Sequence, residues 1–330
     1  MSKSKKFLVL ALASFLVVLG CSSVWAAGWD PKKPVELIAP AGPGGGWDLL
    51  CRIIQKTFQE EKLINKKAIV TNKPGGGGAT GWTYLKGKKG QGEYLAATST
   101  LLILNNLLGK SDLTYKDFTV IANLQAEWIA VAVAEKSPYK TGKDLFEAIK
   151  KDPTKVIIGV GPALGNNDHI SFLMLAQKYG VNPASIKFVV YPQTAAEQIP
   201  ALMGGHVQAI TIGLGEVLEQ HKGKNLRVIG ISAPKGIAVL PGVKTWKEQG
   251  VDMVFPHWRG IIAAPGLSPE QQKYWKDVFA KMVQTKTWKT EIAKLGWDPY
   301  YEDQATHTKT LERQTVEFKK SLQSVGLLPK

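Results

Sequence analysis

Residues 35–50 read VELIAPAGPGGGWDLL, and this stretch sets a pattern that the chain repeats. The apolar run at 35–39 predicts a strand, and Leu50, Ile54 and Phe58 then recur at the spacing of one helix face. The glycines between them form a loop, and Asp48 falls in the first turn of the predicted helix, where a carboxylate meets unpaired N–H groups. The stretch therefore predicts a strand, a glycine loop and a helix in succession.

The same order returns downstream. An apolar run at 68–71 predicts a second strand, which breaks at the glycine loop PGGGGATG of residues 74–81, and residues 94–98 predict a third strand. This alternation predicts an α/β fold with helices on both faces of its sheets. Further strands are expected at 129–134, 156–160, 187–191, 208–212, 227–232 and 260–264, and helices at 144–150, 170–179, 195–203 and 269–284, the last capped by Ser268.

The composition is that of a globular protein: 330 residues, 44% hydrophobic and 21% charged. Chains longer than about 250–300 residues usually divide their core, so we expect two lobes. Because no linker rich in Pro, Gly or Ser separates two halves, the lobes are expected to share crossing strands. The formal net charge is +15, but the lysines are interspersed with acids, which is typical of solvated faces; no nucleic-acid partner is expected.

The first 26 residues have the features of a secretory signal peptide. Lysines precede an apolar run at 7–20, and Val24-Trp25-Ala26 fits a cleavage site. The run is shorter than the roughly 20 residues that span a bilayer. Alternatively, residues 18–21 form a lipobox and Cys21 carries a lipid anchor. In both interpretations the protein is exported, and we expect it in the periplasm.

The two glycine loops predict an anion-binding site. A loop between a strand and a helix start directs several backbone N–H groups and the positive end of the helix to one place. Glycine lets a ligand approach the backbone and permits a positive φ. Because both loops follow the carboxyl ends of strands, they are expected to face one crevice. The alternative is a pair of tight turns, which would not need four consecutive glycines.

A nucleotide is disfavoured as the anion. Residues 76–81 match G-x-G-x-x-G, but no acidic residue follows about 20 positions later to hold a ribose. Neither loop is followed by the Lys-Ser or Lys-Thr of a phosphate-binding P-loop. A carboxylate fits better than a chain of phosphates.

No motif predicts catalysis. The chain lacks G-x-S-x-G and H-E-x-x-H, and its five histidines are scattered singly, so no enzyme activity, cofactor or metal is expected. His169 is interpreted as a structural or capping residue, with ligand contact as the alternative. Arg259, one of four arginines, is suited to binding a carboxylate through two hydrogen bonds. Packing at a hinge beside Trp258 is the equal alternative for this arginine.

Several segments together resemble the Bug family, the TctC-like periplasmic substrate-binding proteins of tripartite tricarboxylate transporters. The similarity runs over essentially all of the chain after the signal peptide, in the family's order. The segments that carry it are 34–48 with Arg52, 72–78, 115–118, His169 after a glycine-rich stretch, Tyr191, 202–205, and Trp258-Arg259-Gly260 followed by Ala264-Pro265.

The resemblance implies a two-lobed periplasmic-binding-protein-like fold (type II), with mixed sheets flanked by helices and lobes joined by crossing strands. The expected domains are a signal peptide at 1–26, lobe 1 at 27–128 and again at 257–330, and lobe 2 at 129–256. The lobe exchange is expected near 128–131 and 256–260.

The resemblance also implies that backbone N–H groups of both loops grip one carboxylate and that the second lobe sets specificity. The chain departs from the family's usual pattern at 165–168 and 192–194, where Gly-Asn-Asn-Asp and Pro-Gln-Thr stand. Because of these changes, the resemblance does not predict which chemical group the ligand carries at the end away from the gripped carboxylate. The residues expected to bind the ligand are Pro43, Gly44, Gly45, Gly46, Trp47, Asp48, Gly76, Gly77, Gly78, Ala79, Thr80, Asn166, Asn167, Tyr191, Thr194 and Arg259.

We therefore expect a monomeric solute-binding protein that captures a small di- or tricarboxylate, citrate-like, and delivers it to the membrane permease subunits of a tripartite tricarboxylate transporter. Two alternatives remain at this point. The same fold presents its ligand to a periplasmic carboxylate sensor, or it binds another carboxylate such as an aromatic acid or an amino acid.

Overall fold

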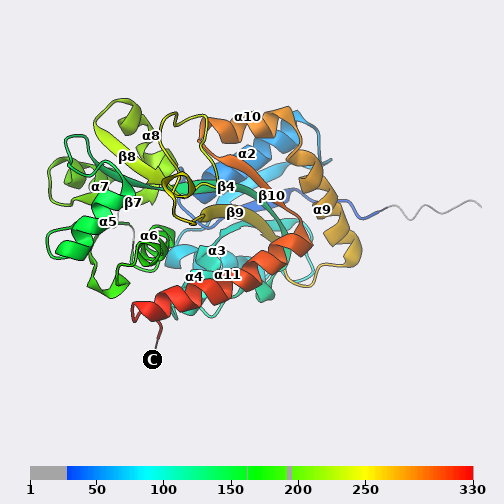
Figure 1. The fold of residues 1–330 in the computed structure, drawn as a ribbon. Helices are drawn as coiled ribbons and strands as arrows, with labels where there is room; N and C mark the ends of the chain where they lie inside the picture. Colours follow the sequence, from blue (N-terminus) through cyan, green and yellow to red (C-terminus); the bar gives the residue numbers. More distant parts are fainter. Residues whose placement is uncertain (1–27, 162, 192–194, 330) are drawn as a thin grey trace, which may run out of the picture. The chain divides into compact units, whose positions relative to one another are not determined.

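A computed structural model describes residues 28–161, 163–191 and 195–329 (Figure 1). Contacts divide the chain into Met1–Asp30 and Pro31–Lys330, and the fold below is that of the second unit. The predicted signal peptide at 1–26, its alternative lipid anchor at Cys21, and Thr194 lie outside the described residues.

Strands and helices alternate over most of this unit. The strands are β1 (Val35–Ala39), β2 (Ala68–Asn72), β3 (Tyr94–Ser99), β4 (Thr119–Ala134), β5 (Ile157–Val160), β6 (Lys187–Val190), β7 (Ala209–Gly213), β8 (Leu226–Ile231), β9 (Pro256–Ala263) and β10 (Asp298–Glu302). The helices are α2 (Gly46–Glu60), α3 (Ala79–Lys86), α4 (Leu101–Leu107), α5 (Gly142–Lys151), α6 (Asn167–Lys178), α7 (Ala195–Met203), α8 (Leu214–Lys222), α9 (Pro269–Met282), α10 (Lys286–Lys294) and α11 (Gln304–Ser324). Single 3-10 turns occur at η2 (Gly76–Gly78), η3 (Tyr115–Asp117), η4 (Pro183–Ser185) and η5 (Lys247–Gln249).

The strands form a mixed sheet in the order β2-β1-β3-β9-β4-β7-β5-β6, with β10 and β8 also paired to β4. Strand β1 is parallel to β2 and β3, and β5 is parallel to β6 and β7. The long strand β4 is antiparallel to its partners: residues 119–128 pair with β9, and residues 129–134 pair with β7 and β8. One strand thus belongs to both halves of the sheet.

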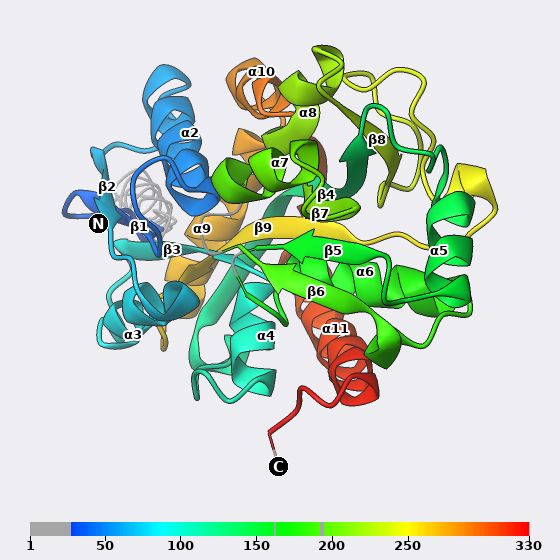
Figure 2. The same ribbon diagram turned by 90° about the vertical axis from the view of Figure 1, so that its left-hand side faces the viewer.

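Helices cover both faces of this sheet. Figure 2 shows α2, α7, α8 and α10 on one side and α3, α4, α6 and α11 on the other. Strand β4 is buried along nearly its whole length, because helices pack on both of its faces. The predicted α/β class, with mixed sheets flanked by helices, is confirmed.

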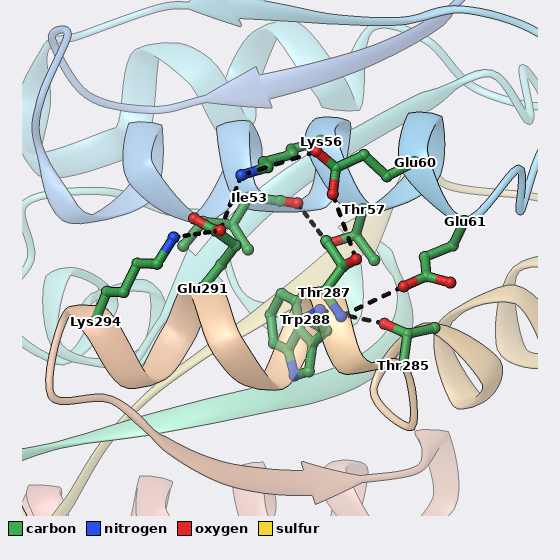
Figure 3. A network of polar contacts seen from close by, with 10 residues as sticks. All are labelled: Ile53, Lys56, Thr57, Glu60, Glu61, Thr285, Thr287, Trp288, Glu291 and Lys294. Carbon is green, nitrogen blue, oxygen red and sulfur yellow. Dashed lines mark hydrogen bonds and ion pairs between the residues drawn. The ribbon is translucent and has the colours of Figure 1, made fainter.

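Helix α10 packs against α2, which begins at the end of the first glycine loop (Figure 3). The indole of Trp288 is fully buried. Around it, Lys56 Nζ lies 2.8 Å from Glu291 Oε1, and the Thr287 N–H donates to Glu61 Oε1 at 3.3 Å. These contacts brace the helix that positions the first loop.

Most predicted elements are confirmed within a few residues, and β1 and α7 have the expected bounds. Ser268 caps α9 by accepting a hydrogen bond from the Gln271 N–H, as predicted. The main difference is β4, which begins at Thr119, whereas the expected strand began at 129. Polar residues interrupt the apolar run in the part that pairs with β9; they are Asn123, Gln125 and Glu127, all buried in the structure.

Candidate functional site

The first glycine loop is held in shape by Asp48, which is 1% exposed. Its Oδ2 accepts hydrogen bonds from the Gly44 N–H and from Arg52 Nε, both at 2.8 Å, and its Oδ1 accepts one from Asn72 Nδ2 at 2.8 Å. Burial opposes ionisation, but the bonds from Arg52, Gly44 and Asn72 outweigh it and lower the pKa of Asp48. This predicted ligand contact therefore orders the loop from inside.

The start of α2 leaves backbone donors unused. Gly45 is the N-cap residue and supplies no side-chain cap. Within the described residues, the N–H groups of Gly46, Trp47 and Asp48 have no acceptor. A helix start of this kind attracts an anion.

The second glycine loop has a backbone that favours glycine at four consecutive positions. Gly75, Gly76, Gly77 and Gly78 have φ values of 130°, 57°, 61° and 105°. The side chain of Asn105 donates to the Gly77 carbonyl at 3.0 Å and so fixes the peptide. In the part of the chain that the structure describes, the N–H groups of Gly76 and Gly77 lack an acceptor. The four glycines are thus explained by the positive φ values that this loop requires.

The two loops lie close together, because β1 and β2 pair in parallel and each loop follows the carboxyl end of one of them. They were expected to face one crevice, but each lines a cavity of its own. The half-buried Trp47 packs edge-on against Trp82, with ring centroids 5.3 Å apart. A Cβ atom at Gly78 would lie 2.8 Å from Trp82 and 3.0 Å from Trp47. Trp47 is therefore the packing contact that joins the loops.

Two neighbouring cavities open beside the loops and share Glu216. The first, about 460 Å³, is lined by the first loop together with Glu127 and Arg259. The second, about 500 Å³, is lined by Gly76 and Gly77 together with residues of α4, α6 and the loop before α6. A separate cavity of about 690 Å³ beside α5 and β8 contains neither loop. Predicted residues lining the first two are Gly44, Gly45, Gly46, Gly76, Gly77, Asn166, Asn167 and Arg259.

Arg259 is buried and already holds a carboxylate of the protein. Its Nη1 lies 2.7 Å from Glu127 Oε2, and its guanidinium lies over the Trp297 ring at 4.9 Å. A Cβ atom at Gly46 would lie 2.5 Å from Nη2 of Arg259, so this glycine makes room for the arginine. Trp258 points elsewhere and donates its indole N–H to Gln314 Oε1 at 2.7 Å. The aromatic neighbour of Arg259 is thus Trp297, where Trp258 was expected.

The predicted contacts at the start of α6 are largely engaged within the protein. Asn166 caps the helix by accepting from the His169 N–H at 3.0 Å. Asn167 hydrogen-bonds Thr100 and His257, linking α6 to β9. His169 accepts the Gly165 N–H through Nδ1 at 2.9 Å, and burial lowers the pKa of His169 to about 4. These bonds fit the structural interpretation of His169.

Four other predicted residues that the structure describes line neither cavity; they are Pro43, Ala79, Thr80 and Tyr191. Pro43 is exposed. Ala79 and Thr80 begin α3 and pack against the second loop: a Cβ atom at Gly76 would lie 3.1 Å from Ala79 Cβ, and one at Gly75 would lie 2.5 Å from Thr80 Oγ1. Tyr191 is half-buried and packs against Gly159. The predicted contact Thr194 is among the residues that the structure does not describe.

Sequence reasoning missed the acidic residues of the site. Glu127 lies near the middle of β4, opposite His257 in the strand register. Asp168 and Glu216 lie in the first turns of α6 and α8 and line the 500 Å³ cavity. A lone acid inside the apolar run of 119–134 was the available signal for Glu127.

The sheet with its shared strand, and the loops opening on cavities, are features of the periplasmic-binding-protein fold. The sequence model of the tripartite tricarboxylate transporter family receptor, TctC, matches residues 50–327, and the chain belongs to this family. Members of the family are solute-binding receptors of the periplasm.

Individual proteins also resemble this chain over most of its length. The UPF0065 protein in the gbd 5' region of Cupriavidus necator is 26% identical, covering 90% of this chain and 89% of its own. Protein BugT of Bordetella pertussis is 24% identical, covering 80% of each chain. A TctC solute-binding protein from Polaromonas has a TM-score of 0.76 at 27% identity, covering 89% of this chain and 99% of its own.

Two solved structures of lower identity share the fold and carry named ligands. An R. palustris protein with adipate has a TM-score of 0.76 at 20% identity, covering 91% of this chain and 99% of its own. MatC from Rhodopseudomonas palustris with bound malate has a TM-score of 0.72 at 17% identity, covering 88% of this chain and 99% of its own.

Two features are absent from the residues that the structure describes. None of their helices combines the length and the apolar character needed to cross a membrane. Nor do three or more of their His, Cys, Asp and Glu side chains gather where they could hold a metal ion.

Proposed function

We propose that this protein captures a small carboxylate, a di- or tricarboxylate, and delivers it to the permease subunits of a tripartite tricarboxylate transporter. The observation that carries the proposal is a set of N–H groups on two adjacent glycine loops that have no acceptor among the described residues; they belong to Gly46, Trp47, Asp48, Gly76 and Gly77. The malate and adipate named for two structural neighbours support a carboxylate. The family's name supports the permease.

The two lobes would close on the ligand and replace its hydration by fixed donors. We assign lobe 1 to 27–128 and 257–330 and lobe 2 to 129–256. The first 26 residues would direct export as a signal peptide, with Cys21 as the alternative lipid site. The mature protein would then work as a monomer in the periplasm.

Native mass spectrometry of the purified protein tests for a carboxylate that co-purifies. Thermal shift with citrate, tricarballylate, succinate, glutamate and benzoate then identifies the preferred class. A ligand at 100 times its Kd adds about 2.7 kcal/mol to the free energy of unfolding, which corresponds to a shift of about 5 °C in Tm. A Tm unchanged by all five compounds would contradict the proposal.

The role of the loop is tested by a matched pair of glycine variants. Gly77→Ala strains a residue with a φ of 61° and places Cβ 3.0 Å from Asn105 Nδ2, so affinity is expected to fall about tenfold or more. Gly250→Ala imposes similar strain at a φ of 84°, where nothing lies within 4 Å, and is expected to leave affinity unchanged. Calorimetric titration measures both, and equal affinities in the two variants would remove the loop from the site.

A further inference from the structure

The 500 Å³ cavity has two kinds of polar lining. The second glycine loop supplies the N–H groups of Gly76 and Gly77, which are hydrogen-bond donors. Helices α6 and α8 supply Asp168 and Glu216, whose carboxylates are acceptors. A ligand with carboxylates alone would satisfy the donors and meet repulsion from the acids.

Asp168 has little compensation for its charge among the residues that the structure describes. Its side chain is 8% exposed, and its Oδ2 receives one long hydrogen bond, from Asn166 Nδ2 at 3.3 Å. Its other oxygen has no donor among the described residues. Asn166 also donates to the Gly161 carbonyl, so its amide is shared between two acceptors. Burying an ionised carboxylate with so few hydrogen bonds is costly, and a cation beside it would reduce that cost.

No described charged group forms an ion pair with Asp168. A Cβ atom at Gly213 would lie 2.8 Å from Glu127 Oε1 and 3.2 Å from Glu216 Oε1, so two further carboxylates face this wall. Arg259 is paired with Glu127. Burial, together with Arg259, lowers the pKa of His257 well below its ordinary value, so this imidazole is neutral.

Lys110 also lines the cavity, but it is exposed and solvated. Burial, Glu216 and Glu127 raise the pKa of Asp168 well above its ordinary value, and the opposing effects of Asn166 and Arg259 do not offset them. The cavity wall thus carries more carboxylates than fixed cations. These carboxylates stand beside the N–H groups of Gly76 and Gly77, which suit an anion.

We propose that the ligand is a carboxylate that also carries an ammonium group, held by Asp168 in the field of Glu216 and Glu127, while the ligand's carboxylate takes the N–H groups of Gly76 and Gly77. An amino dicarboxylate has this chemistry. The inference rests on the proposed function and narrows it: an anion site on the glycine loops is completed by a cation site on α6.

Three matched pairs of compounds test the ammonium requirement directly. Succinate and aspartate, glutarate and glutamate, and adipate and 2-aminoadipate each differ by one amino group on the same carbon chain. Calorimetric titration of the mature protein at pH 7.5 is expected to show at least one pair in which the amino compound binds about tenfold more tightly. The result that overturns the inference is a preference for the plain dicarboxylate, or no preference, in every pair that binds.

Variants locate the source of the preference. Asp168→Asn is expected to reduce the preference for the amino compound to less than about threefold, mainly by weakening its binding. Glu216→Gln is expected to reduce it in the same direction, and it keeps the test decisive if Asp168→Asn fails to fold. Glu270→Gln removes a carboxylate from the second position of α9, the position that Asp168 has in α6. Glu270 lines neither cavity, so this variant is expected to keep the wild-type preference.

The outcomes separate this inference from the function on which it rests. Binding of plain dicarboxylates accompanied by proton uptake would indicate a neutral Asp168 acting as a donor; it would overturn the ammonium site and leave the carboxylate function intact. Equal loss of both members of a pair in Asp168→Asn, with the fold retained, would also overturn it. Absence of binding by all six compounds and by citrate would contradict the proposed function itself.

Discussion

His169 couples the stability of the fold to pH. Its Nδ1 accepts the Gly165 N–H, so its proton is on Nε2 and the ring is neutral. Burial lowers the pKa of His169 to about 4, against about 6.5 in the unfolded chain. Above pH 6.5 the ring is neutral in both states and has no effect. Between pH 6.5 and 4 only the unfolded state binds the proton, so the free energy of unfolding falls as the pH falls.

At pH 5.0 this residue is expected to cost roughly 2 kcal/mol of stability relative to pH 7.5. Urea unfolding at both pH values, for the wild type and for His169→Gln, measures the difference. The variant lacks the titrating ring and is expected to lose less stability on acidification. His257, whose pKa is also lowered by burial, acts equally in both proteins. Equal losses in the two proteins would show that His169 is not the coupled group.

The contact between α2 and α10 is expected to depend on the buried indole of Trp288 rather than on the surface ion pairs around it (Figure 3). Trp288→Ala leaves a cavity between the helices and is expected to lower the free energy of unfolding by about 3–5 kcal/mol. Thr290→Ala, at an exposed position of the same helix, is expected to change it by less than about 0.5 kcal/mol. Urea unfolding compares them, and a Trp288→Ala variant as stable as Thr290→Ala would refute the assignment.

The mature protein as a whole is expected to contract when it binds its ligand. Strands β4 and β9 pass near the proposed lobe boundaries, so a small change in them would move one lobe against the other. Small-angle scattering is expected to give a smaller radius of gyration with saturating ligand. Gly77→Ala at the same ligand concentration serves as the control and is expected to keep the larger radius. An unchanged radius in the saturated wild type would contradict closure.

Local patterns were sufficient for much of the fold. The run at 35–39, the loop after it and the amphipathic spacing of Leu50, Ile54 and Phe58 predicted β1, the first loop and α2. The spacing of apolar residues reflects which face is buried, and that information is contained in a few neighbouring residues. Strand β4 was predicted only from residue 129, since its earlier half carries polar side chains that become buried through distant partners.

The sequence by itself determined the α/β alternation and the two glycine loops, because a helix start and a positive φ depend on residues close together in the chain. Only the tertiary structure decided which charged groups meet at the site. Glu127 and Arg259 pair across 132 positions, and Asp168 and Glu216 reach one cavity from different helices. Such meetings are set by strand register and helix packing over the whole chain, and no short stretch of sequence encodes them.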